Sequence, residues 1–119
     1  MDHDPKALQI VFSAAAPPDL ELLFRPMFGG IMAYAQGKPL ASLSNVGLAL
    51  KAPPALMAEF LSEPGATPLR YEPDAPPSKS YVVAPPAILA DREALRGWIV
   101  KAVAGLAAVS AKKKAKSKP

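Results

Sequence analysis

Fifteen prolines divide this 119-residue chain into short segments and limit the structures that it can form. Proline has no backbone N–H and a fixed φ, so it is found at helix starts, in turns and at sheet edges. Four Pro-Pro pairs stand between segments of regular hydrophobic periodicity, at positions 17–18, 53–54, 76–77 and 85–86. A collagen-like or polyproline chain would need a denser and more regular spacing. We therefore predict a domain of short helices and strands. The chain is long enough to bury one hydrophobic core.

Three segments have the apolar spacing of helices. Residues 5–15 follow Asp4 as a predicted N-cap, residues 53–62 begin with a proline pair, and residues 92–109 follow Asp91 as a cap. The apolar face of the first helix is predicted to be Leu8, Val11, Phe12 and Ala15.

Other segments alternate apolar and polar residues, as strands on a core do. The candidate strands are residues 20–25, 29–36, 39–44, 46–51, 69–72 and 79–84. Pro26 cannot donate to a strand ladder, so the first strand is an edge strand, contains a bulge, or ends there. Strands joined by short turns, with helices on one side, predict a two-layer α+β fold. We expect an antiparallel sheet of five to six strands with three helices.

The net charge of +4 is concentrated at the C-terminus. Residues 1–111 contain nine basic and ten acidic side chains, a net charge of −1, so the whole positive excess comes from a C-terminal cluster of five lysines. These are Lys112, Lys113, Lys114, Lys116 and Lys118. We predict a domain at 1–110 and a disordered lysine-rich tail at 111–119. The tail has two interpretations, a solubilising segment or a weak, sequence-independent contact with nucleic acid.

The sequence contains no cysteine, which excludes disulfides, thiolate metal sites and cysteine nucleophiles. No apolar run is long enough to cross a membrane, and the acidic start lacks the basic and apolar regions of a secretory signal. We expect a cytoplasmic protein without a membrane contact.

Candidates for catalysis are few. His3 is the sole histidine, in an Asp-His-Asp start that lacks further ligands for a metal. Two carboxylate pairs, Glu59 with Glu63 and Glu72 with Asp74, fall on positions expected to be exposed. Four serines have no histidine base to activate them. They are Ser42, Ser44, Ser78 and Ser80. We expect no enzyme activity, no catalytic residue, no metal and no cofactor.

The segment RPMFGGIMAYAQ contains the most distinctive glycine pair, Gly29-Gly30. Phosphate-binding loops place such glycines before a helix N-terminus. Here a strand-like sequence follows, which favours a turn, a bulge or a close approach of two backbones.

Several short motifs follow in a characteristic order. The first combines a basic residue with Met-Phe-Gly-Gly and is followed by LALK at 48–51, LRY at 69–71 and SYVVAP at 80–85. The motif residues are Arg25, Met27, Phe28, Gly29, Gly30, Ser80, Tyr81 and Pro85. Over about residues 5–108, this order resembles the N-terminal domain family of TfoX/Sxy, bacterial regulators of competence.

The resemblance implies an α+β fold similar to secretion-chaperone domains, in which the motif residues are structural. Family members with a second, C-terminal domain activate competence genes together with the cyclic-AMP receptor protein. Because the resemblance ends near the end of this chain, we expect a stand-alone domain. The family supplies no catalytic or cofactor residues.

Two functions of different classes follow. The first is a non-enzymatic adaptor or accessory regulator of transcription, which binds a protein partner such as the transcription machinery or a second copy of itself. The alternative is a small-molecule-binding domain whose pocket lies between sheet and helices near Arg25, Tyr34 and Tyr81. A hydrolase is the least supported possibility.

Overall fold

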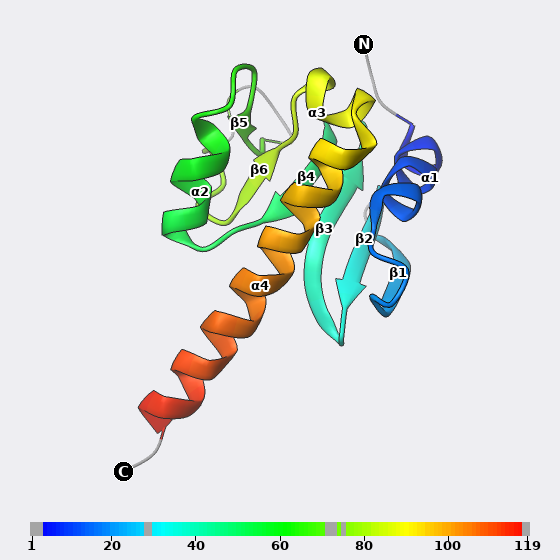
Figure 1. Ribbon diagram of the computed structural model, residues 1–119. Coiled ribbons are helices and arrows are strands. Elements are labelled where there is room, and N and C mark those ends of the chain that lie inside the picture. Colours follow the sequence, from blue (N-terminus) through cyan, green and yellow to red (C-terminus); the bar gives the residue numbers. More distant parts are fainter. Residues whose placement is uncertain (1–3, 28–29, 71–73, 75, 118–119) are drawn as a thin grey trace.

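The computed structural model describes residues 4–27, 30–70, 74 and 76–117, without the side chains of Met27 and residues 107–117. Its helices are α1 (Pro5–Ala15), α2 (Pro54–Leu61), α3 (Pro86–Ala90) and α4 (Arg92–Ser117). Its strands are β1 (Leu22–Met27), β2 (Gly30–Ala35), β3 (Lys38–Ser44), β4 (Gly47–Lys51), β5 (Thr67–Pro68) and β6 (Tyr81–Val83). Figure 1 shows their arrangement. The predicted α+β fold is confirmed, with four helices rather than three among the described residues.

The strands form one antiparallel sheet in the order β1-β2-β3-β4-β6-β5. The first four strands are a meander, and β6 then pairs with β4 while β5 forms the far edge. Both edge strands contain a proline, Pro26 in β1 and Pro68 in β5. Of the alternatives for Pro26, the structure therefore has an edge strand that continues through the proline to Met27.

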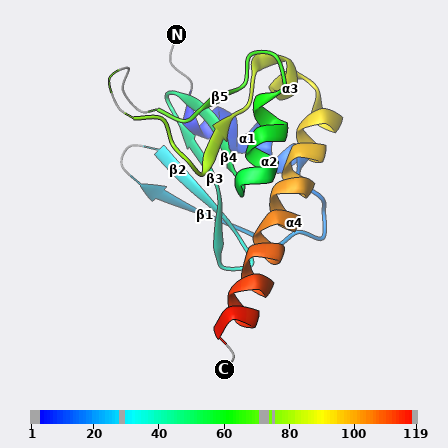
Figure 2. The same cartoon turned by 90° about the vertical axis from the view of Figure 1, so that its left-hand side faces the viewer.

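One face of the sheet is covered by helices. Residues in register across the strands share a face, and one such row consists of Phe24, Ala33, Ala41, Leu50 and Val82. All five belong to, or pack against, a single hydrophobic core that also contains buried residues of α1, α2 and α4. Figure 2 shows α2 and α4 on the same side of the strands.

Two aromatic contacts join the helices to this core. The rings of Phe12 in α1 and Phe24 in β1 pack edge to face, with centroids 6.1 Å apart. Phe60 of α2 stacks on Trp98 of α4 at 4.1 Å and an interplanar angle of 7°. Such pairs contribute about 0.5–1.5 kcal/mol each beyond the area that they bury.

A β-bulge lies between β2 and β3. The register shifts between Ala33 and Tyr34, which leaves Leu40 as an extra residue on β3. Leu40 and its neighbour Ala41 are both fully buried in the core. The bulge also explains how Pro39 is tolerated in an interior strand, because the ladder is already interrupted beside it.

Both predicted helix caps are confirmed. The Oδ1 of Asp4 accepts a hydrogen bond from the Lys6 N–H, and the Oδ1 of Asp91 accepts from the N–H groups of Glu93 and Ala94. These bonds satisfy donors that a helix start leaves without a partner.

α4 is longer than the sequence led us to expect. It continues beyond residue 109 to Ser117, so residues 111–117 have a helical backbone where we expected disorder. Alanine and lysine both have high helix propensity, which allows the segment to extend the helix. The division of the chain into a domain at 1–110 and a tail stays a prediction.

Two short elements differ from expectation. The strand expected at 69–72 is instead β5 at Thr67–Pro68, although the Leu69 N–H still donates to the Tyr81 carbonyl. Residues 71 and 72 lie outside the described residues. α3 was not predicted, because five residues are too few to establish helical periodicity.

The two glycines of α4 give a matched test of packing. A Cβ at Gly97 would meet nothing within 4 Å, whereas a Cβ at Gly105 would lie 2.9 Å from the Cδ of Pro53. We expect Gly97→Ala to raise the free energy of unfolding by up to about 1 kcal/mol through helix propensity. Gly105→Ala gains the same propensity but must displace a rigid ring, so its net effect is a loss of about 1 kcal/mol. Urea unfolding of both variants measures this, and equal stabilisation by both would contradict the close approach of α4 to Pro53.

Candidate functional site

The glycine motif lies in the β1–β2 hairpin at one edge of the sheet. Gly30 is the first residue of β2, opposite Met27, and its φ is outside the left-handed region. A Cβ at this position would lie 2.6 Å from the Leu43 carbonyl oxygen and 3.2 Å from the Cβ of Ser44. Gly30 is therefore required by the close approach of β2 and β3. Since a strand begins here, Gly30 does not present a helix N-terminus to a phosphate. Phe28 and Gly29 lie outside the described residues.

The second family motif lies at β6 and the start of α3. The Ser80 carbonyl accepts a hydrogen bond from the Ala52 N–H, and the Pro85 carbonyl accepts from Ile88 and Leu89. Tyr81 is the first residue of β6 and is opposite Lys51 in β4. These contacts hold β6 beside β4 and begin α3.

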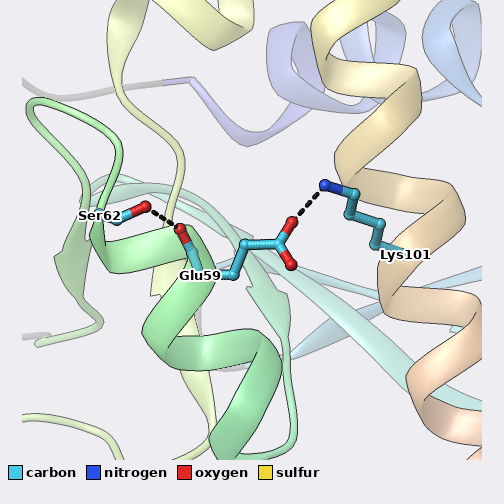
Figure 3. A network of polar contacts seen from close by, with 3 residues as sticks. All are labelled: Glu59, Ser62 and Lys101. Carbon is cyan, nitrogen blue, oxygen red and sulfur yellow. Dashed lines mark hydrogen bonds and ion pairs between the residues drawn. The ribbon is translucent and has the colours of Figure 1, made fainter.

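Glu59, expected to form a carboxylate pair with Glu63, instead interacts with a lysine. The Glu59 carboxylate forms an ion pair with Lys101 of α4, while the Ser62 hydroxyl donates to the Glu59 carbonyl at 2.6 Å (Figure 3). Both charged side chains are about half exposed, at 51% and 54%. An exposed pair of this kind is worth about 0–1 kcal/mol, so its role is to connect α2 to α4 weakly.

The contacts or burial of three of the four candidate serines favour a structural role. Ser78 Oγ accepts from the N–H groups of Ser80 and Tyr81, and Ser44 Oγ accepts from the Val46 N–H. Ser42 is buried in the sheet. Among the described residues, no group of three or more His, Cys, Asp or Glu could hold a metal ion. His3 and Glu72 lie outside that part of the chain.

An open groove lies between α1 and the β1 edge of the sheet, with a volume of about 680 Å³. Its helical wall is one stripe of α1, and its apolar strand side is Phe24, Pro26 and Ile31. The α1 residues that line it are Lys6, Gln9, Ile10 and Ser13. Ile10 is 71% exposed, the largest exposure among the described large hydrophobic residues.

The groove was not predicted from the sequence, although Ile10 stands out in the pattern of α1. Ile10 lies off the apolar face of its helix, since Leu8, Phe12 and Ala15 are the residues that α1 buries. One exposed aliphatic residue is common on a protein surface, and Ile10 becomes informative only because Phe24, Pro26 and Ile31 line the same groove. The strand residues that line the groove become neighbours only through the register of β1 and β2, which places Pro26 opposite Ile31.

The residues proposed to line a ligand pocket lie elsewhere. Arg25 is opposite Met32, Tyr34 is opposite Leu23, and Tyr81 is opposite Lys51. Each alternates with residues of the core row, so all three lie on the face of the sheet away from the helices. The expectation of a pocket between sheet and helices at these residues is wrong, because Phe24 and Val82 take the core side of their strands.

The described part of the chain contains no helix long and apolar enough to cross a membrane.

Comparison with known families decides the identity of the fold. The model of the TfoX N-terminal domain matches residues 21–106, which include every strand of the sheet. The chain belongs to the TfoX N-terminal domain family. No curated protein and no solved structure matches the chain significantly. In this TfoX N-terminal domain, the groove at α1 is formed partly outside the matched region, since α1 precedes residue 21.

Gly30 provides a test of the motif. We expect Gly30→Val to lower the free energy of unfolding by roughly 1–3 kcal/mol, because the new side chain overlaps the Leu43 carbonyl and must separate β2 from β3. Thermal and urea unfolding measure the loss. Gly97→Ala, at an open position, is the control for glycine replacement. Wild-type-like melting of Gly30→Val would contradict a structural role for the motif.

Proposed function

We propose that this TfoX N-terminal domain is a non-enzymatic adaptor, an accessory regulator of transcription that acts by binding a protein partner. Membership of the family supports a TfoX-like role. The observation that carries the proposal is the groove between α1 and β1, which presents exposed apolar surface next to an edge strand.

The groove has the character of a protein-docking surface. Its apolar residues, Ile10, Phe24, Pro26 and Ile31, come from three elements, and polar residues of α1 form the rim. Interfaces commonly combine an apolar centre with a polar rim. Lys6 on that rim is exposed and favours a carboxylate on the partner. The partner is therefore a segment with apolar side chains and a flanking acidic residue.

A small-molecule ligand is the weaker alternative. Ligand sites are usually concave cavities that enclose most of the ligand and direct a few polar groups toward it. The α1 groove is open, and so is a smaller hollow of about 350 Å³ beside Val46, Thr67 and Val83. Open apolar surface favours a macromolecular partner over an enclosed ligand.

The lysine cluster at the C-terminus adds a second, weaker contact to this proposal. Its five lysines attract anionic polymers without sequence preference, and that attraction weakens as salt is added. The contact is auxiliary, since charge alone does not select a partner.

Partner capture from the native cell tests the adaptor role. We expect the tagged wild-type chain to recover RNA polymerase components or a transcription factor. Ile10→Glu should lose them, because it places a carboxylate in the apolar groove. The matched control is Val100→Glu on α4, since Val100 is also an exposed apolar residue, at 48%, but does not line the groove.

Three outcomes would contradict the proposal. One is recovery of neither class of protein by the wild-type chain. Another is recovery of the same partner by Ile10→Glu and wild type. If Ile10→Glu instead changes only the oligomeric state in size-exclusion chromatography, the groove binds a second copy of this chain and the adaptor role fails.

A further inference from the structure

The six strands carry basic residues and no acidic ones. Arg25, Lys38 and Lys51 lie within them, and no aspartate or glutamate does. Register places Arg25 and Lys51 on the face away from the helices, whereas Lys38 is opposite the core residue Ala35. We name this surface the helix-free face, defined by Leu23, Arg25, Met32, Tyr34, Ser42, Ala49, Lys51, Tyr81 and Val83. The strand residues of this face therefore carry only positive charge, while Glu21 precedes β1 at its end.

Each of the two cations stands beside a tyrosine. Lys51 of β4 and Tyr81 of β6 are directly opposite each other, a separation of about 5 Å between Cβ atoms. Arg25 of β1 is opposite Met32, so Tyr34 is its diagonal neighbour on β2, about 7–8 Å away. Both distances are within reach of long side chains. The face thus repeats one unit, a cation with an aromatic ring, at two places on the sheet.

The row next to the two tyrosines has small residues at the centre of the sheet. Ser42 and Ala49 are in register between Met32 and Val83, and both are buried, at 5% and 0% exposure. Tyr34 and Tyr81 are partly exposed and lie on strands three spacings apart, roughly 14 Å. Pro39 is opposite Tyr34 and Lys51 is opposite Tyr81, so a ligand that contacts both rings would pass over Pro39 and Lys51.

A third cation extends the face toward β5. Arg70 lines a hollow of about 350 Å³ together with Thr67 and Val83, which belong to the same face. Arg70 therefore adds a cation after β5, at the opposite end of the sheet from Arg25.

We propose that the helix-free face binds single-stranded nucleic acid. Nucleobases stack on aromatic side chains whatever their sequence, and cations beside them pair with the phosphates. Four-stranded sheets in other domains bind RNA in this way, through rings on an open face. A duplex is a poor ligand for such a surface, because its bases are stacked on one another and hide their ring faces. The exposed Leu23 lies opposite Tyr34 on this face, so loss of a captured protein by variants of the face is the competing outcome of the test.

This site is distinct from the lysine cluster at the C-terminus. That cluster has charge but no aromatic residue, so it cannot distinguish a single strand from a duplex. Tyr34 and Tyr81 supply the rings that the cluster lacks. The proposal also does not depend on the protein partner, since the two surfaces use opposite faces of the sheet.

Fluorescence anisotropy of the full-length chain tests the site. The probes are a labelled 12-nucleotide oligodeoxythymidine and the same strand in a duplex, each titrated at several salt concentrations. We expect the single strand to bind more tightly than the duplex. Tyr34→Leu should weaken single-strand binding about tenfold through lost stacking, and Tyr34→Phe, which keeps the ring, should bind like wild type.

Charge variants complete the test. Arg25→Gln should weaken binding and reduce the slope of log K against log salt by about 0.7, the value for one phosphate contact on a single strand. Arg92→Gln is the matched control, because Arg92 is an exposed arginine at the start of α4. Replacing all five tail lysines by glutamine should reduce the salt slope and retain the weakening by Tyr34→Leu.

Several results would overturn the proposal. They are undetectable binding of the single strand, equal affinity for single strand and duplex, or wild-type affinity of both Tyr34→Leu and Arg25→Gln. Loss of all binding in the lysine variant alone would assign nucleic-acid contact to the C-terminus instead. If Tyr34→Leu melts at a lower temperature, Arg25→Gln decides, since its side chain is exposed. Loss of the captured protein by these variants, with oligonucleotide binding unchanged, would make the face a protein site.

Discussion

The fold depends on covering one face of an antiparallel sheet whose central side chains are small. Ala33 and Ala41 stand in the middle of the core row, and both are fully buried. Small residues let α1 pack closely on β2 and β3, where Phe12 meets Phe24 at the end of that row. The Arg96 Nε of α4 donates to the Ala15 carbonyl at 2.8 Å, which connects the end of α1 to the last helix. The three longer helices thus form one layer, and no helix among the described residues covers the other face.

That asymmetry separates two surfaces of different chemistry. At the covered face, α1 reaches the β1 edge but leaves Phe24, Pro26 and Ile31 beside an open groove. On the opposite face, the strands carry two tyrosines, Tyr34 and Tyr81, and two cations, Arg25 and Lys51. An apolar groove favours a protein segment, whereas a basic aromatic face favours an anionic polymer with flat bases. A single domain of this size can therefore contact two kinds of partner without one excluding the other.

Much of the fold could be predicted because its determinants are local. The caps at Asp4 and Asp91 and the meander follow from residue type and periodicity, whereas an edge strand was one of three alternatives for Pro26. β5 and α3 are too short to show a hydrophobic period. The length of α4 depends on the helix propensity of its last residues, which competes with repulsion among their lysines. The site was harder to predict. Arg25, Tyr34 and Tyr81 were expected beside a pocket between sheet and helices, and only the strand register places them on the other face. The groove depends on the packing of α1 beside β1, which periodicity does not predict.

The edges of the sheet limit how any partner can bind. A partner that adds a strand needs a continuous row of N–H and C=O groups on an edge. β1 contains Pro26, which lacks an N–H, and β5 has only two residues, one of them Pro68. Strand addition is therefore interrupted at β1 and has almost no template at β5. The two proposed surfaces, the α1 groove and the helix-free face, would therefore bind a partner through side chains. Because side-chain contacts are lost by single substitutions while backbone pairing is not, both surfaces can be separated by point variants in an intact fold.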